Sequence, residues 1–140
     1  MKEKLLVSQV AISFLQTAQQ TSNEIAKKLE PFDLSAQQLK ILSIVAKSDE
    51  QKVTVNDIKA EMFDPMSNVS RLLNKLMDKK LIIKIRDEVD QRLVFIKITK
   101  EGISSLIEGK NAMDEAMSTF ENLTQKELIT LSSLIQKIKS

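Results

Sequence analysis

Residues 54–99 constrain the fold more than any other part of the chain, because two short helical patterns and two apolar runs follow one another there almost without gaps. Thr54 is a suitable N-cap, and Val55, Ile58 and Met62 then recur at helical spacing. The pattern predicts a short helix from Val55 to about Met62, which a tight corner must follow.

A second helix is predicted from Pro65 to about Lys80. Asp64 can cap it, and a proline at the first helical position loses no hydrogen bond and already has a suitable φ. Its apolar stripe consists of Val69, Leu72, Leu73, Leu76 and Met77. The two helices therefore form one unit with a short corner.

The polar face of this second helix has the chemistry of a surface for a DNA groove. Short hydroxyl and amide side chains stand near its start, and cationic side chains follow one and two turns later. Residues 65–86 contain six basic residues against one acidic, whereas the whole chain has a net charge of +2. A phosphate-binding surface requires positive charge concentrated in this way.

Two apolar runs, residues 81–85 and 93–98, predict strands, since apolar and other side chains alternate in the second. The charged residues 86–92 between them predict a hairpin loop. Helix, turn, helix and hairpin together predict a winged helix.

The chain resembles the MarR family of bacterial transcriptional regulators. Three landmarks stand in that family's order and spacing: S-N-V-S-R-L-L-N-K-L from Ser67, the D-x-x-D-x-R loop at Asp87, Asp90 and Arg92, and the strand end I-T-K-E-G at residues 98–102. The resemblance implies a mainly α protein with a small β wing. It also implies a homodimeric double-stranded-DNA-binding regulator, most often a repressor, on a pseudo-palindromic operator.

Seven residues are predicted to contact DNA: Ser67, Asn68, Ser70, Arg71, Lys75, Arg86 and Arg92. Base edges and nearby phosphates are assigned to Ser67, Asn68 and Arg71, because an arginine can bind guanine bidentately. Phosphates are assigned to Ser70 and Lys75, with Lys79 a weaker candidate. The competing interpretation, an ordinary solvated helix face, is disfavoured by the position on a helix-turn-helix and by the surrounding positive charge.

In the loop, the resemblance implies that Asp90 structures the wing and that Arg92 reaches the minor groove. Arg86 is expected to pair with an aspartate or to contact phosphate. A calcium or magnesium cluster at Asp87, Glu88 and Asp90 is the alternative, which the short loop between two strands disfavours.

The composition excludes several other classes of protein. The chain has no cysteine and no histidine, so no disulfide, thiol sensor, histidine-rich zinc site or nucleophile–histidine pair can be nominated, and neither an enzyme nor a cofactor is predicted. Its five aromatic residues are scattered phenylalanines, which favours duplex DNA over single strands. No apolar stretch approaches membrane-spanning length and no secretory pattern begins the chain, so a soluble cytoplasmic protein is expected.

The flanking segments are predicted to be helical and to form a dimerisation region. A long helix is predicted over residues 4–29, with a break at Pro31. Helices are also predicted from the capping box at Ser35 to about residue 47, from Thr99 to about residue 120 or 122, and after the capping box at Thr124. Val53 is expected to form a short strand against the wing.

One MarR-like domain is therefore expected over residues 1–140. Its winged part spans 35–99, and its dimerisation helices span 1–30 and 100–140. A small-molecule effector pocket near Phe14, Leu39 and Met113 and a closed core there are equally supported. A winged helix used only for protein–protein contact, and a sequence-indifferent architectural DNA-binding protein, remain alternatives.

Overall fold

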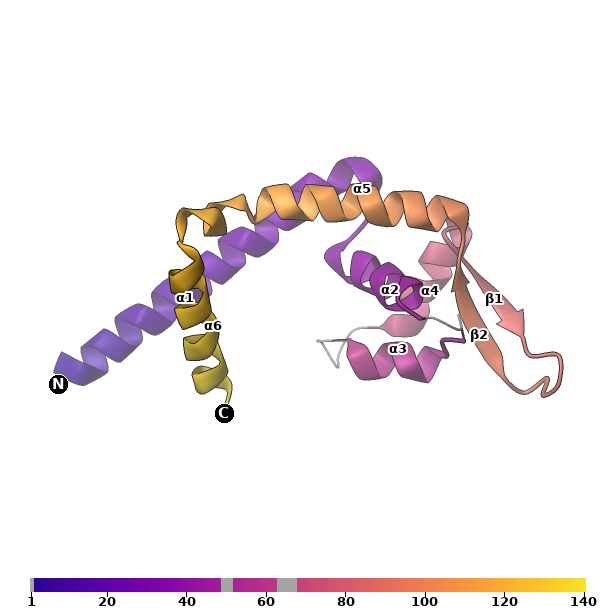
Figure 1. The fold of residues 1–140 in the computed structure, drawn as a ribbon, viewed down its shortest axis with the longest axis horizontal. Coiled ribbons are helices and arrows are strands. Elements are labelled where there is room, and N and C mark those ends of the chain that lie inside the picture. The colour runs from indigo at the N-terminus through magenta and orange to yellow at the C-terminus, as the bar shows by residue number, and fades with distance from the viewer. Residues whose placement is uncertain (1, 49–51, 63–67) are drawn as a thin grey trace. The chain divides into compact units, whose positions relative to one another are not determined.

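The computed structural model of the chain describes residues 2–48, 52–62 and 68–140. The chain divides into two compact units, a helical unit of residues 1–28 and 113–140 and a winged unit of residues 29–112 (Figure 1). The described part contains no helix that is both long and apolar enough to span a membrane.

The winged unit has the element order that the sequence predicted. Its elements are η1 (Glu30–Phe32), α2 (Ala36–Ala46), α3 (Val55–Glu61), α4 (Val69–Asp78), β1 (Ile82–Arg86), β2 (Val94–Ile98) and the first part of α5 (Lys100–Ala116). The core of this unit is made of side chains that are at most 2% exposed, among them Ile41, Leu42, Ile58, Leu73, Leu76, Ile82 and Ile96. These residues come from α2, α3, α4 and both strands, so one core holds the helix-turn-helix and the hairpin together.

Capping chemistry fixes where the helices begin. Ser35 and Gln38 form a reciprocal capping box at the start of α2, in which Gln38 N donates to Ser35 Oγ (3.1 Å) and Ser35 N to Gln38 Oε1 (3.0 Å). Thr54 and Asp57 form the same motif at the start of α3. The hydrogen bonds from Thr54 hold the pKa of Asp57 below its ordinary value. The predicted starts of α2 and α3 are confirmed.

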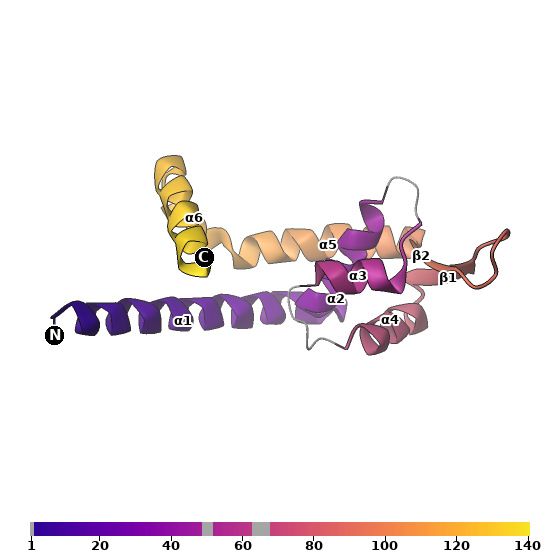
Figure 2. The ribbon, with the colours of Figure 1, turned by 90° about the horizontal axis from the view of Figure 1, so that it is seen from below.

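The wing is an antiparallel hairpin in which Ile82 pairs with Ile98 and Arg86 with Val94 (Figure 2). On its other edge, β2 forms an isolated bridge with Val53, in which Ile96 N donates to Val53 O at 2.7 Å. This confirms the predicted short strand at Val53. One residue therefore ties the segment before α3 to the wing.

The base of the wing packs closely against α5. Thr99 caps this helix, because its Oγ1 accepts from Gly102 N at 3.0 Å. A Cβ on Gly102 would overlap Leu81 O and would lie 2.7 Å from Ile98 Cγ1, so the absence of a side chain permits the contact. The wing therefore starts from a rigid support.

The helical unit contains α1 (Lys2–Leu29, of which Leu29 belongs to the winged unit), the end of α5, η2 (Ser118–Asn122) and α6 (Gln125–Lys139). Thr124 and Glu127 form the predicted capping box at the start of α6. Among the described residues 2–28 and 113–140, Ala116 alone is buried. Within one chain this unit has almost no core.

Several boundaries differ from the prediction. The long helix after the wing ends at Ala116 and continues as the 3₁₀ helix η2, instead of running unbroken to residue 120 or 122. The strands begin at Ile82 and Val94, one residue later than expected. Helix α4 begins at Val69, a difference that concerns the candidate site directly.

Candidate nucleic-acid interface

Asn68 determines the start of α4. Its backbone is not helical (φ −81°, ψ 84°), and its Oδ1 accepts a hydrogen bond from Arg71 N at 3.0 Å. The predicted unbroken helix from Pro65 to about Lys80 is therefore wrong at residue 68, because a helix continuing through that residue would need helical dihedrals there. Residues 63–67, including Asp64, Pro65 and the predicted contact residue Ser67, lie outside the described residues.

The rest of α4 separates into a buried and an exposed face, as predicted. Val69, Leu73 and Leu76 are at most 4% exposed and join the core of the winged unit. The four described residues of the predicted contact set on this helix are all exposed: Asn68, Ser70, Arg71 and Lys75. Packing therefore fixes the orientation in which α4 presents its polar face.

Arg71 and Lys75 carry unpaired charges. They are one turn apart, and among the described residues no carboxylate lies within ion-pair distance of either. An unpaired, exposed guanidinium can form two parallel hydrogen bonds with a guanine edge or a phosphate, whereas an ammonium acts as a point charge. The exposed face of α4 therefore has side chains that suit both the phosphates and the base edges of a nucleic acid.

Helix α4 ends in a Schellman motif that turns the chain into the wing. Lys80 has a left-handed backbone (φ 63°), Lys80 N donates to Met77 O at 2.9 Å, and Leu81 N donates to Leu76 O at 3.0 Å. Glycine is the residue that usually adopts this left-handed conformation, but here a lysine adopts it. The motif fixes the direction of β1 relative to α4.

Lys79, the weaker candidate for a DNA contact, is engaged within the protein. Its Nζ lies 3.4 Å from Asp33 Oδ2 and donates a hydrogen bond to Asp33 O. The side chain of Lys79 is 27% exposed. Sequence reasoning missed this contact, because its two residues are 46 positions apart and no local pattern relates them.

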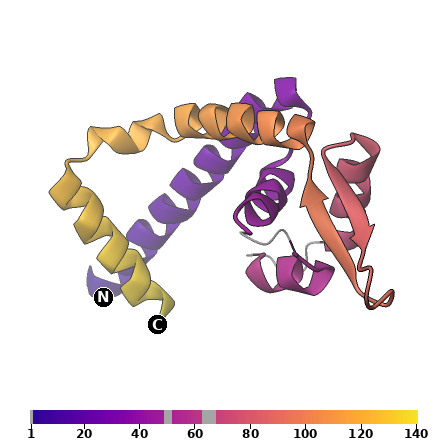
Figure 3. The same ribbon diagram turned by 45° about the vertical axis from the view of Figure 1, so that its right-hand side comes forward.

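In the wing loop, Arg86 turns back on the chain: its Nη1 donates to Gln91 O. Asp87 N donates to Leu93 O (2.9 Å), and Leu93 N donates to Asp90 O (3.0 Å). Arg86 therefore helps to shape the hairpin loop while its charge stays without a carboxylate partner among the described residues. The loop projects away from the helices of the winged unit (Figure 3).

Asp90 holds Arg92 in a fork. Its Oδ1 accepts from Arg92 N (3.1 Å) and Nε (3.0 Å), and its Oδ2 accepts from Arg92 Nη2 (3.2 Å). These hydrogen bonds hold the pKa of Asp90 below its ordinary value of 3.8. The Arg92 side chain is 90% exposed, so it is oriented and still accessible.

The loop carboxylates are used by the loop itself. Asp90 binds Arg92, and Asp87 Oδ2 accepts from Asp90 N at 2.9 Å. Among the described residues, no group of three carboxylates is arranged to hold a metal ion. The arrangement fits a loop that its own carboxylates shape and that presents Arg92 better than a cation site.

The sequence of the chain matches known transcriptional regulators. The profile of the transcriptional regulator SarA/Rot family matches residues 20–108. The HTH-type transcriptional regulator MgrA of Staphylococcus aureus is 34% identical over 117 residues, which cover 84% of this chain and 76% of MgrA. The multiple antibiotic resistance protein MarR of Salmonella typhimurium is 28% identical over 112 residues, with coverages of 79% and 76%.

A solved structure agrees with these relatives. The crystal structure of the S. aureus MepR–DNA complex has a TM-score of 0.80 and 26% sequence identity, and the match covers 91% of this chain and 94% of that chain. The family and these relatives are regulators, not enzymes. The chain therefore belongs to the SarA/Rot family of transcriptional regulators, within the MarR-type winged helix-turn-helix proteins.

Proposed function

We propose that this regulator acts as a homodimer that binds a pseudo-palindromic site in duplex DNA and represses transcription from it. One observation carries the proposal: α4 buries one face in the core and exposes Asn68, Ser70, Arg71 and Lys75 on the other, and neither cation has an ion-pair partner among the described residues. The MepR–DNA complex, 26% identical and similar in fold, supports duplex DNA as the ligand.

The proposed roles follow from the side-chain geometry. Arg71 reads a base edge in the major groove, and Ser70 and Lys75 bind phosphates beside it. Arg92, oriented by Asp90, enters the minor groove, and Arg86 contacts a phosphate at the wing. Two copies of α4 related by a two-fold axis would reach successive major grooves about 34–36 Å apart, which makes the operator pseudo-palindromic.

We infer the dimer from the helical unit. Its helices have large exposed apolar side chains on α1 and on α6, including Leu6 (60%), Val10 (58%), Leu134 (53%) and Ile138 (70%). Helices with an apolar stripe derive most of their stability from burying that stripe. A unit that buries only Ala116 among its described residues needs a partner to become stable, and a second copy presents the same stripes.

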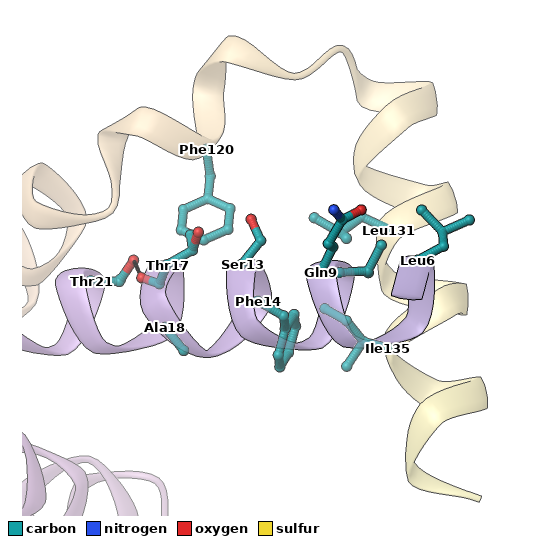
Figure 4. Close-up of a pocket in the computed structure, with 11 residues that line it drawn as sticks. Leu6, Gln9, Ser13, Phe14, Thr17, Ala18, Thr21, Phe120, Leu131 and Ile135 are labelled. Carbon is teal, nitrogen blue, oxygen red and sulfur yellow. Dashed lines mark hydrogen bonds between the residues drawn. The ribbon is translucent and has the colours of Figure 1, made fainter. Parts of the chain in front are cut away.

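A groove within this unit provides a place for the second copy. It has a volume of about 710 Å³ and lies between α1, η2 and α6, where Phe120 points toward α1 (Figure 4). Its lining is mostly apolar and carries no charged residue: Leu6, Gln9, Val10, Ser13, Phe14, Thr17, Ala18, Thr21, Phe120, Leu131 and Ile135. An apolar helix stripe from the partner subunit fits such a lining.

DNA binding is tested by fluorescence polarisation on two duplexes, the promoter region upstream of the chain's own gene and a random sequence of equal length. We expect salt-dependent binding to both and tighter binding to the promoter duplex. The Arg71→Ala/Lys75→Ala double variant should lose this binding, whereas the charge-matched control Lys126→Ala/Lys137→Ala should keep it. Wild-type protein without salt-dependent duplex binding would instead favour a winged helix used for protein contacts.

Assembly is tested by sedimentation equilibrium. The wild type should have twice the 15.8 kDa mass of one chain. Val10→Glu places a charge in the groove and should shift the mass toward one chain. Ser8→Glu is the control, because Ser8 is exposed and lies on the opposite side of α1. A wild type that remains a single chain at micromolar concentration would contradict the dimer.

A small-molecule effector is a second element of the proposal. Of the three residues expected near a pocket, Phe14 lines the groove of the helical unit, whereas Leu39 is buried in the winged unit. An apolar ligand competing for that groove would change the spacing of the two α4 helices and shift the DNA-binding population. We place the protein in the cytoplasm, where its proposed duplex ligand lies.

A further inference from the structure

The contact between Lys79 and Asp33 joins two parts of the winged unit that are distant in sequence. Lys79 is the C-cap of α4, and Asp33 follows η1 in the connection that leads to α2. Asp33 has a left-handed backbone (φ 53°), and its N donates to Glu30 O at 3.0 Å. A local turn therefore holds the acceptor in place.

Lys79 contacts both the main-chain oxygen and the side-chain carboxylate of Asp33. Its Nζ donates to the main-chain oxygen and lies 3.4 Å from the carboxylate oxygen Oδ2. The side chain is mostly covered, at 27% exposure, whereas Lys75 one turn earlier is exposed and has no ion-pair partner in the described part of the chain. The positive charge of Lys79 therefore lies beside a carboxylate of the protein, whereas that of Lys75 faces solvent.

We propose that Lys79 does not contact DNA and instead positions α4 for sequence reading by anchoring its C-terminal end to Asp33. This inference rests on the proposed DNA-binding function and assigns Lys79 a different role from Lys75. The anchor also links the direction of α4 to the connection that follows α1.

The length of α4 shows why such an anchor matters. Arg71 lies eight residues before Lys79, which corresponds to about 12 Å along a helix. If the C-terminal end came loose and the helix tilted by about 5° about a point midway between the two residues, Arg71 would move by about 0.5 Å. Donor–acceptor distances of good hydrogen bonds span only about 0.5 Å. Base reading should therefore weaken, while a looser phosphate contact should tolerate the movement.

The expected effect is modest, because Asp33 is 91% exposed and exposed ion pairs are weak. Losing the anchor can weaken specific binding by no more than the free energy that the contact between Lys79 and Asp33 contributes. We expect Lys79→Met to reduce affinity for a specific duplex by about two- to fivefold. Affinity for a random duplex should stay unchanged.

Salt dependence separates positioning from phosphate contact. Each phosphate neutralised by a lysine contributes about 0.9 to the slope of log affinity against log salt concentration. Lys75→Met, the matched control on the same helix, removes one lysine from each subunit of the dimer, so it should lower this slope by about 1.8 and weaken binding to both duplexes. Lys79→Met should leave the slope unchanged.

The experiment uses the full-length protein and a duplex of about 30 base pairs selected by the wild type from a random library, long enough for two half-sites one turn apart. Asp33→Asn removes the carboxylate and keeps a residue that tolerates a left-handed backbone. Acting through the same contact, it should weaken specific binding no more than Lys79→Met does. The double variant should lose no more than Lys79→Met alone. All variants are measured at a temperature where circular dichroism shows them folded.

The outcomes separate this inference from the proposed function. A wild type that binds no duplex would overturn the proposed function itself. Wild type and Lys75→Met behaving as expected, with Lys79→Met losing the same salt slope as Lys75→Met, would overturn the positioning role alone. So would a Lys79→Met variant that unfolds at lower temperature but keeps the ratio of specific to random affinity.

Discussion

Adding one methyl group at Gly102 should destabilise the protein severely, although alanine is the better helix former. Gly102 lies in the first turn of α5, where a Cβ would overlap Leu81 O and would come within 2.7 Å of Ile98 Cγ1. Leu81 O also accepts from Thr99 N (3.0 Å) and Thr99 Oγ1 (3.1 Å). The Thr99 hydroxyl also donates to Lys80 O at 2.8 Å and would keep that bond, so Leu81 O cannot retreat without breaking the hydrogen bond from Thr99 N.

The magnitude follows from these contacts. Overpacking costs about 1–3 kcal/mol, and the lost hydrogen bond from Thr99 N costs about 1 kcal/mol. The higher helix propensity of alanine returns about 1 kcal/mol. We expect Gly102→Ala to lower the free energy of unfolding by about 1–3 kcal/mol.

Gly109→Ala is the matched control in the same helix. Its Cβ would meet the Cδ1 atom of Leu39 at 2.5 Å, which is the end of a side chain that can rotate away. The propensity gain and the smaller clash should nearly cancel, which leaves the free energy of unfolding within about 1 kcal/mol of the wild type.

The assay is urea unfolding followed by circular dichroism, at one fixed protein concentration because a dimer gains stability with concentration. The midpoint of Gly102→Ala should fall well below those of the wild type and of Gly109→Ala. Equal midpoints for the two alanine variants would refute the argument that the close approach of α5 to the wing is sterically enforced.

Three further substitutions test the interface. Arg71→Ala should lose about 1–3 kcal/mol of operator binding in a polarisation assay, and an equal loss on random duplex would reassign Arg71 to phosphate contact. Asp90→Asn should weaken operator binding by releasing Arg92. Because the pKa of Asp90 lies below its ordinary value of 3.8, the wild-type wing should keep this contact at neutral pH and lose it only as the pH falls below that value. Amide chemical shifts measured against pH can follow the loss. Lys80→Gly should raise the urea midpoint or leave it unchanged, since it relieves a left-handed lysine, and a clear fall would contradict that reading.

The fold could be predicted from the sequence wherever local chemistry decides it. The capping boxes at Ser35, Thr54 and Thr124 carry their own hydrogen bonds within four residues, so their sequence pattern and their structure coincide. Strand alternation likewise predicted the hairpin. The MarR-type family assignment is confirmed by the matches to the SarA/Rot profile and to MgrA.

Two features could not be predicted from local sequence patterns: the start of α4 and the contact between Lys79 and Asp33. The sequence predicted a helix start at Pro65 with Asp64 as its cap, whereas the structure shows Asn68 as the N-cap of α4. The contact of Lys79 with Asp33 depends on the packed unit, so no window of the sequence contains it. The DNA contacts themselves remain predictions.

The cap at the start of α4 also limits what this regulator can recognise. With one lone pair of its oxygen bound to the main chain at Arg71, the amide of Asn68 offers DNA its N–H₂ group and the second lone pair of that oxygen. It can donate to guanine, thymine or phosphate oxygens, whereas pairing with adenine through both amide atoms requires the oxygen to accept a second hydrogen bond in the geometry that the cap imposes, and losing the cap would cost about 1 kcal/mol. Operator positions facing Asn68 should therefore show a bias toward hydrogen-bond acceptors, and an adenine preference there would contradict this expectation.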